Sequence, residues 1–293
     1  MSFRFDRWAT LKVVKPLVKQ TSATPKVPIL MYHAISDDGE SVHPYYRTNT
    51  SPSVFALQMQ QLRELGYSTI SLDEAVKTIK ADRVSDGRAV VITFDDGYRD
   101  FYTYAAPVLT ACGFTATMFV PTAHINDVAT RFKGRDCLTW SEIQELQSLG
   151  MQFGSHTVSH PQLHDLEDSQ VEREVAESKD AMEQRLGRGV ESFAYPYAFP
   201  ETDKVFVGKL RRWLIAAGYR NGVCTMIGRA DASNNPLFLK RLPVNSCDDH
   251  ELFAAKLAGA YDWLARPQYV LKRFKAGANR PGTKGFKASI SSA

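Results

Sequence analysis

The chain of 293 residues lacks any hydrophobic run that approaches the roughly 20 uncharged apolar residues of a transmembrane helix, so a membrane-spanning protein is excluded. Its 18 glycines and 14 prolines are ordinary numbers, which excludes a fibrous or wholly disordered chain. The four cysteines form no CxxC pair, which argues against a disulfide framework and a structural zinc site. The N-terminus lacks the unbroken apolar core of a secretory signal, which indicates a cytoplasmic or membrane-peripheral location.

The net charge of +4 is concentrated at the two ends of the chain. Residues 1–27 carry six basic residues and one acidic residue, and residues 267–293 carry six basic residues and no acidic one. The segment between them therefore holds 24 basic and 31 acidic residues, a balance of −7. Because this acidic body contains no basic helix or aromatic-basic motif, nucleic-acid binding is rejected. The basic ends remain candidates for contact with an anionic membrane or polymer.

Short apolar runs alternate with longer helical patterns along the acidic body. Residues 89–94 (AVVITF) form a continuous run of the kind found in parallel strands that are buried on both faces. Ser71 with Glu74, and Thr139 with Glu142, have the spacing of capping boxes at helix starts. Repeated strand–helix units over some 240 residues predict an α/β fold, and their number favours a closed (β/α) barrel.

We therefore expect a single folded domain over residues 27–266. A basic N-terminal extension, residues 1–26, precedes it, and a basic tail, residues 267–293, follows it. The tail ends in a sequence rich in glycine, lysine and serine, which predicts disorder.

Three clusters of candidate functional residues follow predicted strands, at the end of a parallel barrel where active sites lie. The acids Asp95 and Asp96 come directly after residues 89–94, either as a turn or as a metal ligand beside a proton acceptor. His156 and His160 are four residues apart, so both imidazoles can reach one ion if the segment is helical or turn-like. The third cluster is 193–197 (FAYPY), which either packs or offers a backbone N–H to an oxyanion.

The order of these motifs resembles the polysaccharide deacetylases, the NodB homology domain of carbohydrate esterase family 4. The resemblance rests on residues 93–98 (TFDDGY), 155–160 (SHTVSH) and 195–197 (YPY), with 28–33 (PILMYH) and 138–140 (LTW) in support. It covers roughly residues 27–250, and it is strongest to members that act on poly-N-acetylglucosamine and related exopolysaccharides. It implies a distorted (β/α) barrel that removes N-acetyl groups from an N-acetylated glycan.

The resemblance also implies roles for individual residues. Asp96, His156 and His160 would hold a divalent metal, commonly zinc, and Asp95 would be the general base. The backbone N–H of Tyr197 would help to form the oxyanion hole. Two histidines and one carboxylate leave coordination positions open for water and a substrate carbonyl, as in a catalytic metal site.

Two departures from the family pattern need an explanation. The family's third motif often has an arginine two residues before its proline, where this chain has Ala194. We expect Arg241 to replace that arginine and to orient the base. The family's late leucine-x-histidine motif, whose histidine acts as general acid, has no clear match near residue 240, so we expect His33 to supply the acid, with His250 as the next candidate.

Three other interpretations stay open at this stage. A set of two histidines and one carboxylate also describes non-haem iron oxygenases, although these usually place the ligands closer together on an all-β scaffold. The same barrel could act on a small N-acyl or cyclic amide instead of a glycan. A barrel that has lost catalysis could bind glycans without cleaving them, but the presence of both acids and both histidines argues against this.

Overall fold

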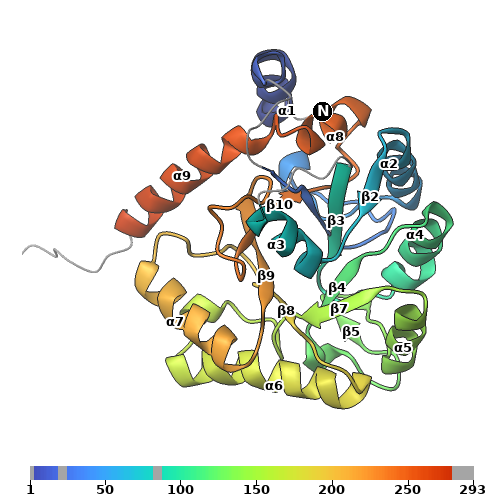
Figure 1. The fold of residues 1–293 in the computed structure, drawn as a ribbon, viewed down its shortest axis with the longest axis vertical. Coiled ribbons are helices and arrows are strands. Elements are labelled where there is room, and N and C mark those ends of the chain that lie inside the picture. The colour runs from blue at the N-terminus through green and yellow to red at the C-terminus, as the bar shows by residue number, and fades with distance from the viewer. Residues whose placement is uncertain (1–2, 19–24, 82–87, 279–293) are drawn as a thin grey trace, which may run out of the picture.

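The computed structural model describes residues 3–18, 25–81 and 88–278 of the chain. Within these residues, seven parallel strands close into a barrel in the order β1-β10-β9-β8-β7-β4-β3, with β3 pairing back onto β1 (Figure 1). The strands are β1 (Ile29–Tyr32), β3 (Arg88–Phe94), β4 (Thr117–Val120), β7 (Gln152–Ser155), β8 (Ser192–Ala194), β9 (Asn221–Ile227) and β10 (Leu239–Pro243). A short strand, β2 (Tyr67–Thr69), pairs with the beginning of β3. This confirms the predicted single-domain (β/α) barrel.

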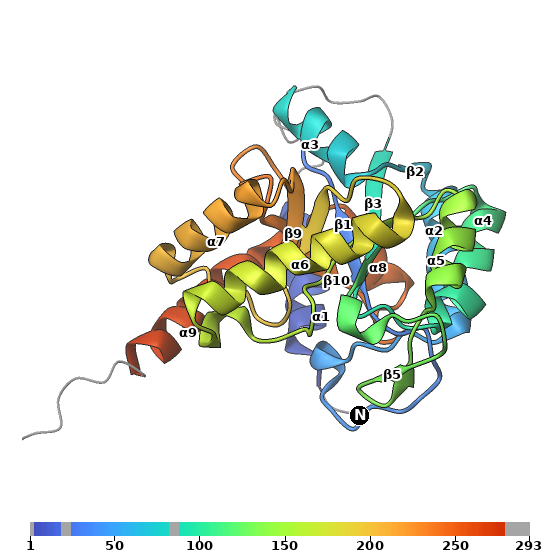
Figure 2. The same cartoon turned by 90° about the horizontal axis from the view of Figure 1, so that it is seen from below.

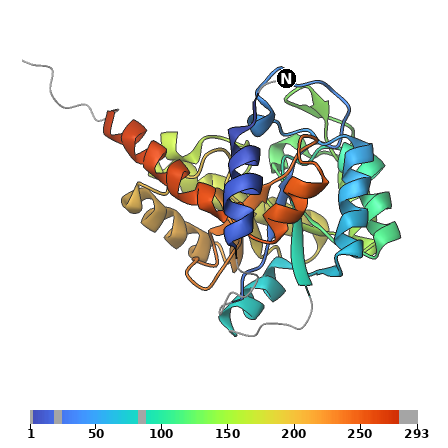
Figure 3. The same ribbon diagram turned by 90° about the horizontal axis from the view of Figure 1, so that it is seen from above.

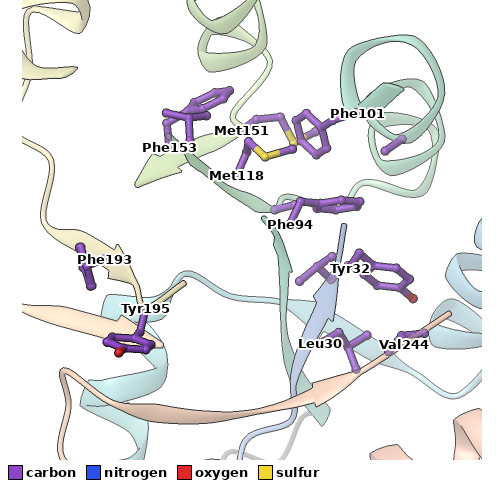
Figure 4. Close-up of a cluster of buried hydrophobic side chains, with 14 of the residues drawn as sticks. Leu30, Tyr32, Phe94, Phe101, Met118, Met151, Phe153, Phe193, Tyr195 and Val244 are labelled. Atoms are coloured by element: carbon purple, nitrogen blue, oxygen red, sulfur yellow. The ribbon is translucent and has the colours of Figure 1, made fainter. Parts of the chain in front are cut away.

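Helices surround the barrel because each strand buries its outward side chains against them. They are α2 (Pro52–Glu64), α4 (Ala106–Cys112), α5 (Trp140–Ser148), α6 (Asp168–Leu186), α7 (Lys204–Ala216) and α8 (His250–Leu257). The outer core is aromatic: the Phe94 ring stacks on Tyr32 at 5.3 Å and meets Phe101 edge-on at 4.8 Å (Figure 4). Both predicted capping boxes are present, at Ser71 and at Thr139.

The barrel interior is a second, separate hydrophobic cluster. Alternate residues of the strands contribute to it, because successive side chains of a strand point to opposite faces. Its members include Ile29, Val91, Phe119, Ala194, Val223 and Leu239. Helix α3 (Leu72–Lys80) adds its apolar face to the same cluster and thereby closes one end of the barrel (Figure 2).

The alternation that buries Val91 continues along β3 and directs Thr93 and Asp95 inward. On β10 the same periodicity places Arg241 inward two residues after Leu239. On β7 the inward position is occupied by Gly154. A side chain does not fit there, because a Cβ added to Gly154 would lie 2.5 Å from the Phe119 ring. The inward residues at the carboxyl ends of β3 and β10 are therefore polar, and they lie at the end opposite α3.

The N-terminal extension packs against the barrel. Helix α1 (Phe5–Ala9) continues through a π-helical turn, η1 (Thr10–Val14), and a 3-10 turn, η2 (Lys15–Leu17), and η1 contacts α8 (Figure 3). The buried Asp6 carboxylate accepts hydrogen bonds from Arg4 and Tyr261. The extension is thus attached by ion pairs and hydrogen bonds as well as by apolar contacts.

The disorder predicted for the tail is wrong for its first part. Residues 265–278 form helix α9 (Ala265–Ala278), which begins two residues before Pro267. Proline is tolerated in the first turn of a helix, so it does not interrupt this one. Lys272 attaches α9 to the body by bonds to the Phe199 carbonyl (3.1 Å) and Glu201 (3.0 Å).

Residues 279–293 lie outside the described residues, so the predicted contact of the basic tail with an anionic surface stays a prediction. The same holds for the domain boundaries at residues 27 and 266. Within the described ranges, no helix has both the length and the apolar character needed to cross a membrane.

Candidate metal-dependent active site

Three predicted ligands converge at the end of the barrel opposite α3. Asp96 follows β3, while His156 and His160 lie in the loop after β7, and one ligand atom from each lies within 4.8 Å of the others. Nε2 of His160 is 3.0 Å from Oδ1 of Asp96, and Nε2 of His156 is 3.7 Å from the same oxygen. All three side chains are buried. The loop after β7 is a turn and not a helix, and this geometry still brings both imidazoles to one carboxylate.

The protonation of this group suits a cation. Nδ1 of His156 is 2.8 Å from the Ala194 carbonyl, so it donates there and leaves Nε2 free of a proton on the side of Asp96. Burial lowers the pKa of His156 to about 4, which keeps the imidazole neutral. Burial opposes the charge on Asp96, but the His160 hydrogen bond and nearby positive charge, including that of Lys133, outweigh it and lower its pKa.

Nδ1 of His160 is buried without a hydrogen-bond partner in the described part of the chain. Two imidazoles and one carboxylate are the donor set of an open catalytic site for zinc or a similar metal. The residues present therefore fit a divalent cation, held by Asp96, His156 and His160.

Asp95 lies beside this group but is held by a different partner. Both of its carboxylate oxygens accept hydrogen bonds from the Arg241 guanidinium, each at 2.7 Å. Arg241 also donates to the Cys224 carbonyl and to Thr93 Oγ1, both at 3.2 Å. Burial alone would raise the pKa of Asp95, but the charge of Arg241 lowers it below its ordinary value. Asp95 is therefore an ionised carboxylate in a fixed orientation.

The position of Arg241 explains the alanine at residue 194. Ala194 and Arg241 both face the barrel interior, from β8 and β10, and β9 pairs with both of these strands. The small Ala194 side chain leaves interior space, and a guanidinium from two strands away reaches Asp95.

His33 and Tyr197 complete the set of predicted residues around Asp95 and Asp96. His33 follows β1 and places Nε2 4.0 Å from Oδ2 of Asp95, with about a fifth of its side chain exposed. The Tyr197 ring meets the His160 ring edge-on at 4.7 Å. His250 is exposed and begins α8.

Backbone strain is concentrated in these loops. Within the described residues, the non-glycine residues with positive φ are Asp96 (75°), Lys133 (50°), Thr157 (70°), His160 (58°) and Tyr197 (57°). A left-handed conformation costs a non-glycine residue about 1–2 kcal/mol. Asp96 and His160 are candidate metal ligands, and Thr157 lies in the turn between the two histidines. Lys133 contacts Asp96, and Tyr197 packs against His160.

Three contacts escaped the sequence interpretation. Tyr98 donates to Oδ2 of Asp96 at 3.0 Å, and Lys133 reaches the same oxygen at 3.4 Å. Glu174 of α6 accepts hydrogen bonds from the backbone N–H groups of residues 158 and 159, at 2.8 and 2.9 Å, and so fixes the histidine turn. Tyr98 belongs to the first motif and could have been inferred, but Glu174 lies among other acids in a charged helix.

Comparison with known proteins agrees with this architecture. The family described as polysaccharide deacetylase matches residues 82–212. The chain is 30% identical over 230 residues to the putative polysaccharide deacetylase YxkH of Bacillus subtilis, covering 77% of this chain and 74% of that protein. It is 27% identical over 160 residues to the poly-beta-1,6-N-acetyl-D-glucosamine N-deacetylase of Staphylococcus epidermidis, covering 52% and 54%.

A solved structure extends the similarity to three dimensions. The Streptococcus pyogenes deacetylase PplD, in complex with acetate, matches with a TM-score of 0.68 and 28% identity, over 80% of this chain and 99% of that one. Sequence and fold thus agree over more than two thirds of both chains for two of these relatives. The chain therefore belongs to the polysaccharide deacetylase family.

Proposed function

We propose that this protein is a metal-dependent hydrolase that removes N-acetyl groups from an N-acetylhexosamine-containing glycan. The observation that carries the proposal is the pairing of a possible cation site, Asp96 with His156 and His160, with a carboxylate that Arg241 keeps charged. The relatives support the substrate class: one is a poly-beta-1,6-N-acetyl-D-glucosamine N-deacetylase, and another holds acetate, the acid that this reaction releases.

The reaction joins the oxygen of water to the acetamide carbonyl carbon and breaks the carbon–nitrogen bond, so acetate and an amine leave. A divalent cation at the three ligands, most simply Zn²⁺, would lower the pKa of water and polarise the carbonyl. Asp95 then takes a proton from the attacking water as general base. Its bidentate contact with Arg241 holds it charged and aimed, so the arginine acts as a positioning residue.

The developing oxyanion needs a hydrogen-bond donor, and we assign this role to the backbone N–H of Tyr197. The positive φ of Tyr197 aims its peptide group in a direction that few non-glycine residues adopt. One such donor is typically worth about 3 kcal/mol of transition-state stabilisation.

Departure of the amine requires a proton, which we assign to His33. It is partly exposed and lies on the Asp95 side of the site, so it can receive a proton from solvent and give it to the leaving group. His33→Gln tests this: the variant should lose most of its kcat, and its pH–rate profile should lose the alkaline limb. A variant that kept the alkaline limb would show that another group is the acid.

The whole proposal is tested by metal analysis combined with acetate release from N-acetylglucosamine oligomers. We expect one divalent ion per chain, and acetate release that Asp95→Asn reduces by about 100-fold or more. Asp127→Asn is the matched control, because Asp127 is an exposed acid paired with Arg185. Bound metal with acetate released only from small N-acyl amides would move the substrate away from glycans, and absence of both metal and acetate would refute the function.

A further inference from the structure

A small hairpin brings a lysine to the candidate metal site. It consists of β5 (Arg131–Phe132) and β6 (Arg135–Asp136), inserted between β4 and α5. The two turn residues, Lys133 and Gly134, have φ of 50° and 81°, as in a type I′ turn. Asparagine and glycine suit such a turn, so a lysine there is a strained choice that a structural role does not explain.

The Lys133 ammonium points into the site. Its Nζ lies 3.4 Å from Oδ2 of Asp96, above the rings of Phe132 at 4.6 Å and Tyr197 at 5.3 Å. The side chain is 40% exposed, so it also borders the solvent through which a substrate enters. The ring faces hold the ammonium by cation–π attraction and limit its motion.

The other cations of the hairpin are engaged elsewhere. Arg131 pairs with Asp136 at 3.2 Å, and Arg135 pairs with Asp38 at 3.0 Å. Lys133 is paired instead with a carboxylate that belongs to the candidate metal site. Its charge would therefore repel a cation bound there.

The sum of the charges at the site predicts which kind of ligand Lys133 binds. Asp95 is neutralised by Arg241, and Asp96 by Lys133, so a divalent cation between neutral imidazoles would leave an excess of positive charge. Such a centre favours an anion. Amide hydrolysis generates one, first as the oxyanion of the acyl group and then as acetate.

We propose that Lys133 binds the acyl oxygen of the substrate and the carboxylate of the released acetate, at the expense of metal affinity. The proposal rests on the function above, which defines the anion. It makes Lys133 a further positive group of the site, provided by a hairpin outside the barrel.

Lys133→Asn is the main variant, because asparagine tolerates the left-handed turn and removes the charge. Lys133→Arg keeps the charge, and Arg131→Gln is the control on the same hairpin. Zn²⁺ affinity of the apoprotein is measured by competition with a chelator, and acetate affinity of the zinc-loaded protein by calorimetry. Neither measurement needs a glycan, so each can succeed or fail independently of the proposed function.

Lys133→Asn should bind Zn²⁺ about three- to tenfold more tightly and acetate about tenfold more weakly, because a charge-assisted contact to the anion is lost. Lys133→Arg and Arg131→Gln should stay within about twofold of the wild type in both measurements. A structural role would not tighten metal binding. If acetate affinity in Lys133→Asn equals that of the wild type, or Zn²⁺ affinity falls, the proposal is overturned.

Discussion

Replacing Arg241 by methionine should be one of the most damaging single substitutions in this barrel. Arg241 and Asp95 are 1% and 2% exposed, and two 2.7 Å hydrogen bonds join them. Methionine has a similar apolar bulk but leaves the Asp95 charge buried without its partner. Thr93 Oγ1 and the Cys224 carbonyl lose a donor as well.

Breaking a buried ion pair by removing one partner costs about 3–5 kcal/mol, a large share of the 5–15 kcal/mol that stabilises a typical protein. Burial raises the pKa of Asp95, and without the Arg241 charge less opposes this effect, so the pKa rises. Asp95 would therefore be protonated over more of the acidic range, and the acidic limb of the pH–rate profile should move to higher pH.

Urea unfolding, monitored by circular dichroism, measures the free-energy change. Arg185→Met is the control, because Arg185 and Asp127 form an exposed pair that should contribute less than about 1 kcal/mol. The double variant Asp95→Asn/Arg241→Met should be more stable than Arg241→Met alone, since it leaves no buried charge unpaired. A loss below about 1 kcal/mol in Arg241→Met, with an unmoved acidic limb, would refute the reasoning.

Burial raises the pKa of Asp100 from 3.8 to about 6, so the folded state binds its proton more tightly than the unfolded state. Stability therefore falls as pH rises from about 4 to 6, and above that range the charged carboxylate costs up to about 3 kcal/mol. Asp100→Asn should accordingly raise the thermal midpoint at pH 8 more than at pH 5, and equal shifts would contradict this. Removing bound metal with a chelator should abolish acetate release and lower the thermal midpoint, and Zn²⁺ should restore both; a chelated protein with full activity would exclude the metal-dependent mechanism. Gly154→Ala should cost about 1–3 kcal/mol in urea unfolding, because its Cβ would lie 2.5 Å from Phe119. Gly208→Ala is the contrasting variant: within helix α7 its Cβ meets nothing within 4 Å, so it should stabilise by up to about 1 kcal/mol.

Much of the fold could be predicted because its signals are local. Capping boxes at Ser71 and Thr139 determine helix starts through side chains only three residues apart. The hairpin of residues 131–136 escaped prediction because two-residue strands have no periodicity to detect. Its one signal was the Lys133–Gly134 pair, since glycine often occupies the second position of a hairpin turn. The composition of residues 267–293 as a whole does not reveal helix α9, which occupies only residues 265–278.

Some residues of the candidate site could likewise be predicted from local motifs, and one depends on the tertiary structure. Asp95 and Asp96 are neighbours, and His156 and His160 are four residues apart, so each pair could be recognised within one motif. Arg241 is distant from Asp95 in sequence, and only closure of the barrel brings the two together. Its role as the arginine partner could be formulated from the alanine at residue 194, but the 2.7 Å contacts depend on tertiary structure.

The distribution of strain separates the candidate site from the rest of the barrel. In the described residues, the five left-handed non-glycine residues all lie in the site or on the hairpin above it, while the other positive-φ positions are glycines. At about 1–2 kcal/mol each, they represent a substantial cost that a sequence selected only for stability would avoid with glycine or asparagine. The apolar interior and the aromatic outer core of the barrel supply the stabilisation that offsets this cost. Lys133 and His160 converge on the Asp96 carboxylate, the Tyr197 ring packs against both, and the Thr157 hydroxyl accepts a hydrogen bond from the His160 backbone N–H. That convergence is expected of a site built to bind a cation and an anion together, and it argues against a barrel that has lost catalysis and only binds glycans.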